Sequence, residues 1–311
     1  MELTEEEIEE LLAHYLGEEL EVPSSVPMPD QWEELRPVVV TTAAEAREAA
    51  RALRGQGQVA VDCEAAGGMH RFGRLSVVQV ADWRGQCWLF DVTAGGDAVL
   101  GPIKGLLEDS RVVKVMHDCR SDSDLLFHGH GVRVRHVADT QVAYAVLLTS
   151  DGQLPPLPVS LRTLHARFGV SAFGRVKELA RDEMGDDADY WDRRPFTPLM
   201  LQYAAQDVRW MVYIYRQILS LLSEAGARLL AEYSALYANQ YRSLSSAHRR
   251  AAVDAEETRD PSIRFVPSYG IPSWDAIARP LDGLSTAKRF RPANDTPQQL
   301  RRKTHREAFF S

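Results

Sequence analysis

The chain has 311 residues, of which 45% are hydrophobic and 26% are charged, and its formal net charge is −8. This composition is typical of a globular protein and argues against a disordered, collagen-like or coiled-coil chain. No run approaches the ~18 apolar residues of a membrane-spanning helix, and the Glu-rich start, MELTEEEIEELL, is unlike a signal or transit peptide. We therefore expect a cytoplasmic or nuclear protein that is not secreted and has no membrane partner.

The net charge averages segments of opposite sign. Residues 1–22 contain nine Glu and no Lys or Arg, and subtracting these nine negative charges leaves +1 for residues 23–311. Residues 288–311 contain seven Lys or Arg against two Asp or Glu, a balance of +5. The overall charge therefore does not exclude a nucleic-acid partner. The basic tail suits sequence-independent phosphate contacts, and a solubilising role or a nuclear signal fits it equally well.

The first predicted elements follow an acidic segment and Pro/Ser-rich linker over residues 1–36. VVV at 38–40 predicts a strand, and Thr42 with Glu45 matches a capping box opening a helix to about Leu53. Apolar, β-branched runs predict strands at 59–61, 75–81, 87–92 and 112–116, and apolar periodicity predicts helices at 98–107, 122–127 and 140–148. Three closely spaced strands followed by alternation with helices indicate an α/β domain with a mixed β-sheet.

The second half of the chain is predicted to be helical. Helices are expected at 161–168 and 176–184, and one long helix from Pro198 to Leu222 closes a domain that spans residues 37–222. Residues 223–250 form a helical extension with Tyr233, Tyr237 and Tyr241 spaced four apart, which favours packing on the domain or a partner helix over base stacking. Residues 251–311 read as a mostly irregular basic tail.

The three cysteines give no sign of a metal or disulfide framework. Cys63, Cys87 and Cys119 are at least 23 residues apart and form no C-x-x-C pair. We expect reduced and mostly buried thiols.

The first candidate site motif is Asp62 and Glu64 in VAVDCEAAGG. On a strand, residues two apart share a face, so the two carboxylates project together while Cys63 points to the other side. Two charges at the end of an apolar strand are costly without a cation or hydrogen bonds, which suggests a metal site. A D-x-E triplet also occurs by chance on exposed surfaces, so this motif is weak by itself.

The second candidate is Asp122, after a strand that ends at His117. Asp122 lies three and four residues before Leu125 and Leu126, which places it toward the apolar side of the following helix. Asp118 could cap that helix, and the spacing of Asp124 turns it toward solvent.

The third candidate is the pair Tyr203 and Asp207 in LQYAAQDVRW. They are i and i+4 on the long helix and project from one face. A phenol beside a carboxylate suits water activation, although an isolated Y-x-x-x-D is more often a core aromatic and an exposed acid.

Taken together, these three motifs resemble the DEDD-type 3′-5′ exonucleases, and Tyr203 resembles the defining residue of their tyrosine subgroup (DEDDy), whose best-known member is ribonuclease D. The resemblance runs from about Val38 to Leu222, and its most specific part is WDRRPFTPLMLQYAAQDV. The segments HDCRSDSDLL and ADTQVA look most like those of the Egalitarian-related eukaryotic branch. The fold implied is a ribonuclease H-like mixed sheet flanked by helices, with a helical C-terminal extension.

The resemblance also implies a two-metal hydrolysis of phosphodiester bonds from the 3′ end of single-stranded nucleic acid, with RNA favoured over DNA. Two Mg²⁺ or Mn²⁺ ions would be held by Asp62, Glu64, Asp122 and Asp207, with Asp62 shared between them. Tyr203 would orient or deprotonate the attacking water, and positioning suits it better because an ordinary phenol has a pKa near 10.

Several other residues invite weaker hypotheses. Met69 and Phe72 could wedge against terminal bases, Arg71, Arg74 and Arg120 could meet phosphates or be surface charges, and Lys177 could approach the substrate backbone or be exposed. His117 is expected to be hydrogen-bonded at a strand end, and His128 and His130 to lie in a loop.

Two further functions compete with an exoribonuclease. An RNA-binding adaptor could keep the domain as a platform, because the same scaffold can host binding alone. DNA could be the substrate, because acids that bind metal and phosphate do not report a 2′-hydroxyl. A protein partner could bind the acidic N-terminal segment or the helical extension.

Overall fold

The computed structural model describes residues 36–150, 160–168, 170, 173–185 and 187–257. The acidic segment up to residue 35 and the basic tail from residue 258 lie outside this range, so the expectations for them remain predictions.

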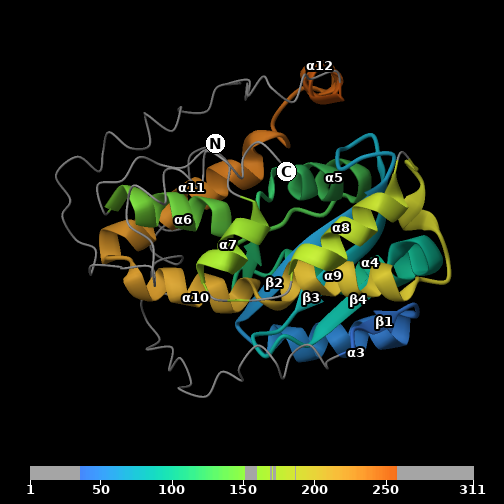
Figure 1. Cartoon of the computed structure of the whole chain (residues 1–311), viewed down its shortest axis with the longest axis horizontal. Helices are drawn as coiled ribbons and strands as arrows, with labels where there is room; N and C mark the ends of the chain where they lie inside the picture. Colours follow the sequence, from blue (N-terminus) through green and yellow to red (C-terminus); the bar gives the residue numbers. More distant parts are fainter. Residues whose placement is uncertain (1–35, 151–159, 169, 171–172, 186, 258–311) are drawn as a thin grey trace.

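A six-stranded mixed sheet forms the centre of the molecule (Figure 1). The strands run in the order β1-β4-β3-β2-β5-β6, with β2 antiparallel to β3 and parallel to β5. Their bounds are β1 Val38–Val40, β2 Gln58–Ala66, β3 Arg74–Ala81, β4 Cys87–Asp91, β5 Val113–Met116 and β6 Val137–Asp139. The predicted mixed α/β architecture is confirmed. Strand β6 was not predicted, because its sequence is VAD with one β-branched residue, whereas the equally short β1 is VVV.

Helices surround the sheet. Their bounds are α3 Ala43–Arg54, α4 Val92–Leu107, α5 Arg120–His130, α6 Thr140–Ser150, α7 Leu161–Arg167, α8 Phe173–Met184, α9 Pro198–Arg209, α10 Met211–Leu221, α11 Glu224–Gln240 and α12 Ser246–Glu257, with a 3-10 turn, η1, at Tyr190–Asp192. The predicted capping box is confirmed, because the Thr42 hydroxyl accepts from Glu45 N and the Glu45 carboxylate accepts from Thr42 N.

Two segments that were each predicted to be one continuous helix are each divided into two helices. The long helix expected over 198–222 is two helices that meet at Trp210, and the extension over 224–250 breaks at residues 241–245 and continues to Glu257, past the expected end at 250. In both places buried residues lie on each side of the break, so apolar periodicity runs through it and cannot locate it.

Strand β2 presents the candidate site on one face of the sheet. Residues opposite each other on neighbouring strands share a face, so Asp62 and Glu64 lie on the same side as Gln79 and Val77. On that side, Val77 and Leu89 pack with Met200 and Ala204 of α9 and with Tyr190 and Trp191 of η1. This packing fixes α9 across the strands that carry the acids, and Figure 1 shows α8 and α9 in front of them.

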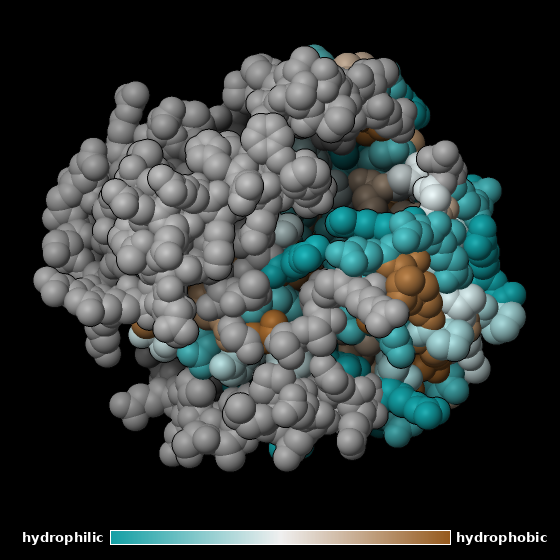
Figure 2. Space-filling view, in the orientation of Figure 1, coloured by the Kyte–Doolittle hydropathy of each residue, from teal (hydrophilic) through white to brown (hydrophobic). Residues whose placement is uncertain are grey.

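The surface of the described part is mainly hydrophilic on the side of α8, with small hydrophobic areas (Figure 2). Across the described residues, the exposed large hydrophobic side chains are Val38, Phe127, Leu179 and Leu236. No helix in this part of the chain is long and apolar enough to cross a bilayer. All three cysteines are buried and unpaired with one another, as expected.

Candidate active site

Strand β2 holds two carboxylates side by side at its end. Burial alternates along this part of the strand, with Asp62 and Glu64 half-buried and Cys63 buried, as the period of a strand dictates. A register shift after Glu64 interrupts the ladder with β3. Gln79 on β3 donates from Nε2 to Glu64 Oε1 at 3.2 Å, which fixes one oxygen of that carboxylate.

Helix α9 brings Asp207 to the same place. Thr197 caps the helix by accepting from Met200 N, and Pro198 occupies its first turn, where a missing N–H costs nothing. Ten residues along α9, the buried Asp207 carboxylate lies beside the strand acids. One oxygen each from Asp62, Glu64 and Asp207 lie within 4.8 Å of one another.

Asp122 reaches the cluster from α5. The start of α5 is anchored by Asp139, whose carboxylate accepts from Cys119 N at 2.8 Å and from Gln141 N at 2.9 Å. Asp122 is buried, and the charges of Asp62 and Asp122 act on one another. Its Oδ1 is buried and has no hydrogen-bond partner in the described part of the chain. Asp122 is not within the 4.8 Å group, and its carboxylate is hydrogen-bonded to the side chain and the backbone of Cys63, between the two acids of β2.

The four carboxylates share a shortage of positive charge. Burial raises the pKa of Asp62, Glu64 and Asp207, and the neighbouring acids add to the rise for Asp62 and Glu64. Burial also raises the pKa of Asp122 to about 7. Lys177 Nζ of α8 lies 2.5 Å from Asp207 Oδ1, and the charges of His117 and Arg181 also act on Asp207. Despite these groups, burial keeps the pKa of Asp207 above its ordinary value.

Tyr203 stands one helical turn before Asp207, on the same face of α9. Its ring lies 4.8 Å from Lys177 Nζ and 5.6 Å from the Trp191 ring centroid. Burial, followed by the charges of Asp207, Glu64 and Asp62, raises the pKa of its hydroxyl. The phenol therefore stays protonated at neutral pH and can donate a hydrogen bond.

The donor set fits hard divalent cations. Carboxylate oxygens are the ligands that Mg²⁺ and Mn²⁺ prefer, and three of them, from two elements, lie within 4.8 Å of one another. The unpartnered Asp122 Oδ1 and the raised pKa values indicate a pocket whose negative charge the protein leaves uncompensated.

Several expectations from sequence are wrong. Asp124 is fully buried and not solvated, because it pairs with Arg71 at 2.7 Å and with Arg249 at 3.2 Å. Arg71 and Arg120 were expected to be phosphate contacts or surface charges, but both form ion pairs inside the protein. Arg71 pairs with Asp124, and Arg120 pairs with Asp118. His128 and His130 lie in the last turn of α5 and not in a loop. Arg74 is an exposed charge, which was one of its two expected roles, and it pairs with Asp189 and Asp192.

Other features of the site were predicted or missed for clear reasons. His117 is hydrogen-bonded, as expected, with Nδ1 2.9 Å from Thr140 Oγ1. Asp139 was missed as the anchor of α5, although an Asp directly before the T-Q-V helix is a capping signal. His165 of α7 is buried, and burial lowers its pKa to about 3. The sequence could have indicated that burial, because His165 lies four residues after Leu161 and three before Phe168, on the apolar side of the predicted helix.

Residues 37–223 match the sequence profile of a family described as 3′-5′ exonuclease. The chain belongs to the 3′-5′ exonuclease family. Its relatives include ribonuclease D of Pseudomonas paraeruginosa, 33% identical over 195 residues that cover 61% of this exonuclease and 46% of the relative. The piRNA biogenesis protein EXD1 of Xenopus laevis is 28% identical over 202 residues, covering 63% of this chain and 43% of the relative.

The fold of this exonuclease is also that of ribonuclease D. The crystal structure of Trypanosoma brucei RNase D in complex with RNA U12 superposes with a TM-score of 0.61 at 23% identity, covering 82% of each chain. The chain spans less than half the length of the curated relatives it matches. The expected likeness to the Egalitarian branch is partial, because the Egalitarian protein homolog of Caenorhabditis elegans matches at 43% identity over 63 residues, 20% of this chain.

Proposed function

We propose that this exonuclease hydrolyses the phosphodiester bonds of single-stranded RNA from the 3′ end with two divalent ions, Mg²⁺ or Mn²⁺, held by Asp62, Glu64, Asp122 and Asp207. The observation that carries the proposal is the convergence of three carboxylate oxygens, from β2 and α9, within 4.8 Å. Their number and chemistry match a hard-cation site.

The carboxylates divide into two groups by position. Asp62, Glu64 and Asp207 are close enough to hold one ion together, and the charge of Asp122 acts on Asp62, which suits a second ion shared with Asp62. When bound, such ions supply Lewis-acid stabilisation of the phosphate oxygens and make water a better nucleophile at neutral pH. Gln79 contributes by holding Glu64 in place.

Tyr203 has a positioning role in this scheme. Its raised pKa keeps the proton on the hydroxyl, so it acts as a hydrogen-bond donor and not as a general base. Lys177 fixes the Asp207 carboxylate and lies against the Tyr203 ring, so it keeps the two residues of α9 in their relative positions.

The choice of RNA is supported by the relatives. One relative is a ribonuclease D, and the Trypanosoma brucei RNase D with the same fold is in complex with RNA U12. The carboxylates themselves act on the phosphate and do not distinguish RNA from DNA, so both must be tested.

The test is digestion of 5′-labelled single-stranded RNA and DNA of the same sequence by the full chain, with Mg²⁺, Mn²⁺ or EDTA. We expect a ladder that shortens from the 3′ end with either ion, no cleavage in EDTA, and faster cleavage of RNA. Asp207→Ala should leave the substrate intact, whereas Glu48→Gln, which removes an exposed acid of α3, should behave as wild type. Equal inactivity of wild type and Asp207→Ala across ions and substrates would overturn the proposal.

A further inference from the structure

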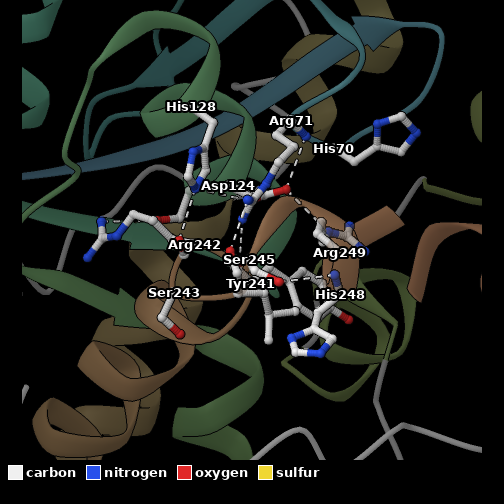
Figure 3. A network of polar contacts seen from close by, with 12 residues as sticks. His70, Arg71, Asp124, His128, Tyr241, Arg242, Ser243, Ser245, His248 and Arg249 are labelled. Atoms are coloured by element: carbon white, nitrogen blue, oxygen red, sulfur yellow. Dashed lines mark hydrogen bonds and ion pairs between the residues drawn. The ribbon is translucent and has the colours of Figure 1, made fainter. Parts of the chain in front are cut away.

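A second charged cluster lies beside the candidate active site, and a 3′-5′ exonuclease reaction as proposed above does not use it. Its centre is Asp124 of α5, whose side chain is completely buried. Arg71 donates to it from the backbone N at 3.0 Å and from Nε at 2.9 Å, and Arg249 donates from Nε at 3.2 Å. The side chains of both arginines are 3% exposed or less. Figure 3 shows the three residues converging from separate parts of the chain.

The cluster joins two segments. Arg71 belongs to the β2–β3 loop, residues 67–73. Arg249 belongs to residues 241–250, which comprise the connection after α11 and the start of α12 and which we call the C-terminal clamp. The two ends of the Arg71 guanidinium also donate to the carbonyl oxygens of Leu244, at 3.0 Å, and Tyr241, at 2.7 Å. Every side of the Arg71 head group is thus held by Asp124 or by the C-terminal clamp.

Further contacts extend the junction on both sides. The Arg249 guanidinium lies 4.1 Å from the Tyr241 ring centroid, and that of Arg250 lies 3.6 Å from the Phe72 ring centroid. His128 of α5 bonds to the Arg242 carbonyl oxygen at 2.9 Å. The C-terminal clamp therefore contacts both the β2–β3 loop and α5, as the contacts around Arg71, Asp124 and His128 in Figure 3 show.

The β2–β3 loop is tied directly to the site. It continues the strand that carries Asp62 and Glu64, and Gly67 N donates to Ala188 O, in the connection between α8 and α9, at 2.7 Å. Gly68 has φ +100°, and a Cβ at Gly73 would lie 2.1 Å from Gly68 O, so the loop closes tightly on itself. The loop is therefore compact, and Arg71 is the residue of the loop that forms an ion pair in these contacts.

We propose that the C-terminal clamp holds the β2–β3 loop in the position that receives the 3′ end of the substrate, with Arg249 as a positioning residue that acts through Asp124 and Arg71. The claim that the loop receives the 3′ end of RNA rests on the proposed function. The claim that the clamp holds the loop in place does not. Residues 241–250 lie outside the matched exonuclease region, so the reaction depends on a segment beyond it.

The test compares Arg249→Gln with Arg249→Lys in the full chain. Arg249→Gln removes one cation from a buried pair, frees the loop and should raise KM for a short single-stranded RNA about tenfold while kcat stays within about twofold of wild type. A variant that only unfolds in part would instead lose kcat at unchanged KM. Arg249→Lys keeps the charge and should bring KM back to within about threefold of wild type. Arg47→Gln, at an exposed position of α3, is the matched control.

Hydrogen exchange without substrate separates the two proposals. Arg249→Gln should speed amide exchange in peptides covering residues 67–73 and leave α3 unchanged. Unchanged exchange in the loop, or faster exchange at unchanged KM, overturns the positioning role. If the wild type degrades neither RNA nor DNA, the proposed function fails, and with it the catalytic half of this inference, even where the loop exchanges faster.

Discussion

Helix α5 carries two buried aspartates, two residues apart, with opposite surroundings. Asp124 is enclosed by Arg71 and Arg249, and both of its oxygens accept hydrogen bonds. Asp122 has an oxygen without a partner, and its pKa is raised to about 7 by burial. On a helix, residues two apart point about 200° apart, so one turn serves two different sites.

The difference separates a structural acid from one that we propose binds a metal ion. A buried carboxylate is tolerated when fixed cations surround it, and around Asp124 the chain supplies them. Around Asp62, Glu64, Asp122 and Asp207, the chain supplies Lys177 and little else that is positive in the described contacts. Burial without compensation is costly for folding, which is consistent with a site built to bind cations.

The largest expected effect is on catalysis. Asp62→Asn removes the carboxylate that both proposed ions share, and we expect kcat on single-stranded RNA to fall by about a thousandfold or more, equivalent to about 4 kcal/mol. Asp124→Asn should leave kcat of the folded protein within about threefold of wild type. Steady-state kinetics at saturating Mg²⁺ measures both, with Glu48→Gln as control, and equal losses in the two aspartate variants would contradict the distinction.

The next largest effect is on the free energy of unfolding. Here the substitution of Asp124 should cost more than the substitution of an acid of the candidate site. Asp124→Asn leaves two buried arginines without their counter-ion, and we expect the free energy of unfolding to fall by about 3–5 kcal/mol. Asp122→Asn removes an uncompensated charge, so the metal-free protein should be as stable as wild type or more stable. Urea denaturation in EDTA at pH 8 compares the two variants. A loss of less than about 1 kcal/mol for Asp124→Asn would show that its arginines are not important for stability.

Sequence reasoning was most successful where one helix or strand determines the outcome. The alternation of a strand placed Asp62 and Glu64 on one face, and the i, i+4 spacing placed Tyr203 beside Asp207. It failed for Asp124, because its solvation depends on Arg71 and Arg249, which are 53 and 125 residues away in sequence. No local pattern reports such partners. Lys177 was left undecided for the same reason, since its contact with Asp207 is made between two helices.

Metal binding should stabilise the protein through the acids of the candidate active site and not through Asp124. An ion at about 100 times its Kd adds about 3 kcal/mol to the free energy of unfolding, and so raises Tm by roughly 5–10 °C. We expect this increase with Mn²⁺ for wild type and for Asp124→Asn, from a lower starting Tm. It should be absent from the Asp62→Asn, Asp207→Asn double variant. Thermal unfolding with Mn²⁺ and with EDTA measures it, and a Tm increase retained by the double variant would place the ion elsewhere.

The smallest expected effect is on the pH dependence of the metal-free protein. Folding raises the pKa of Asp122 from an ordinary value near 4 to about 7, so between these values the folded state holds a proton that the unfolded state releases. The stability contributed by this group is therefore complete below pH 4 and is lost as the pH rises to 7.

Asp122→Asn cannot titrate, so subtracting its unfolding free energy from that of wild type isolates this contribution. We expect the unfolding free energy of wild type to fall by about 2 kcal/mol relative to that of Asp122→Asn between pH 5 and pH 8. Urea denaturation in EDTA measures both. Glu48→Gln, at an exposed position of α3, is the control for the substitution itself. A flat result for Asp122→Asn would mean that the carboxylate is ionised throughout and already compensated, and Asp122 would then belong with Asp124 and not with the acids proposed to bind metal.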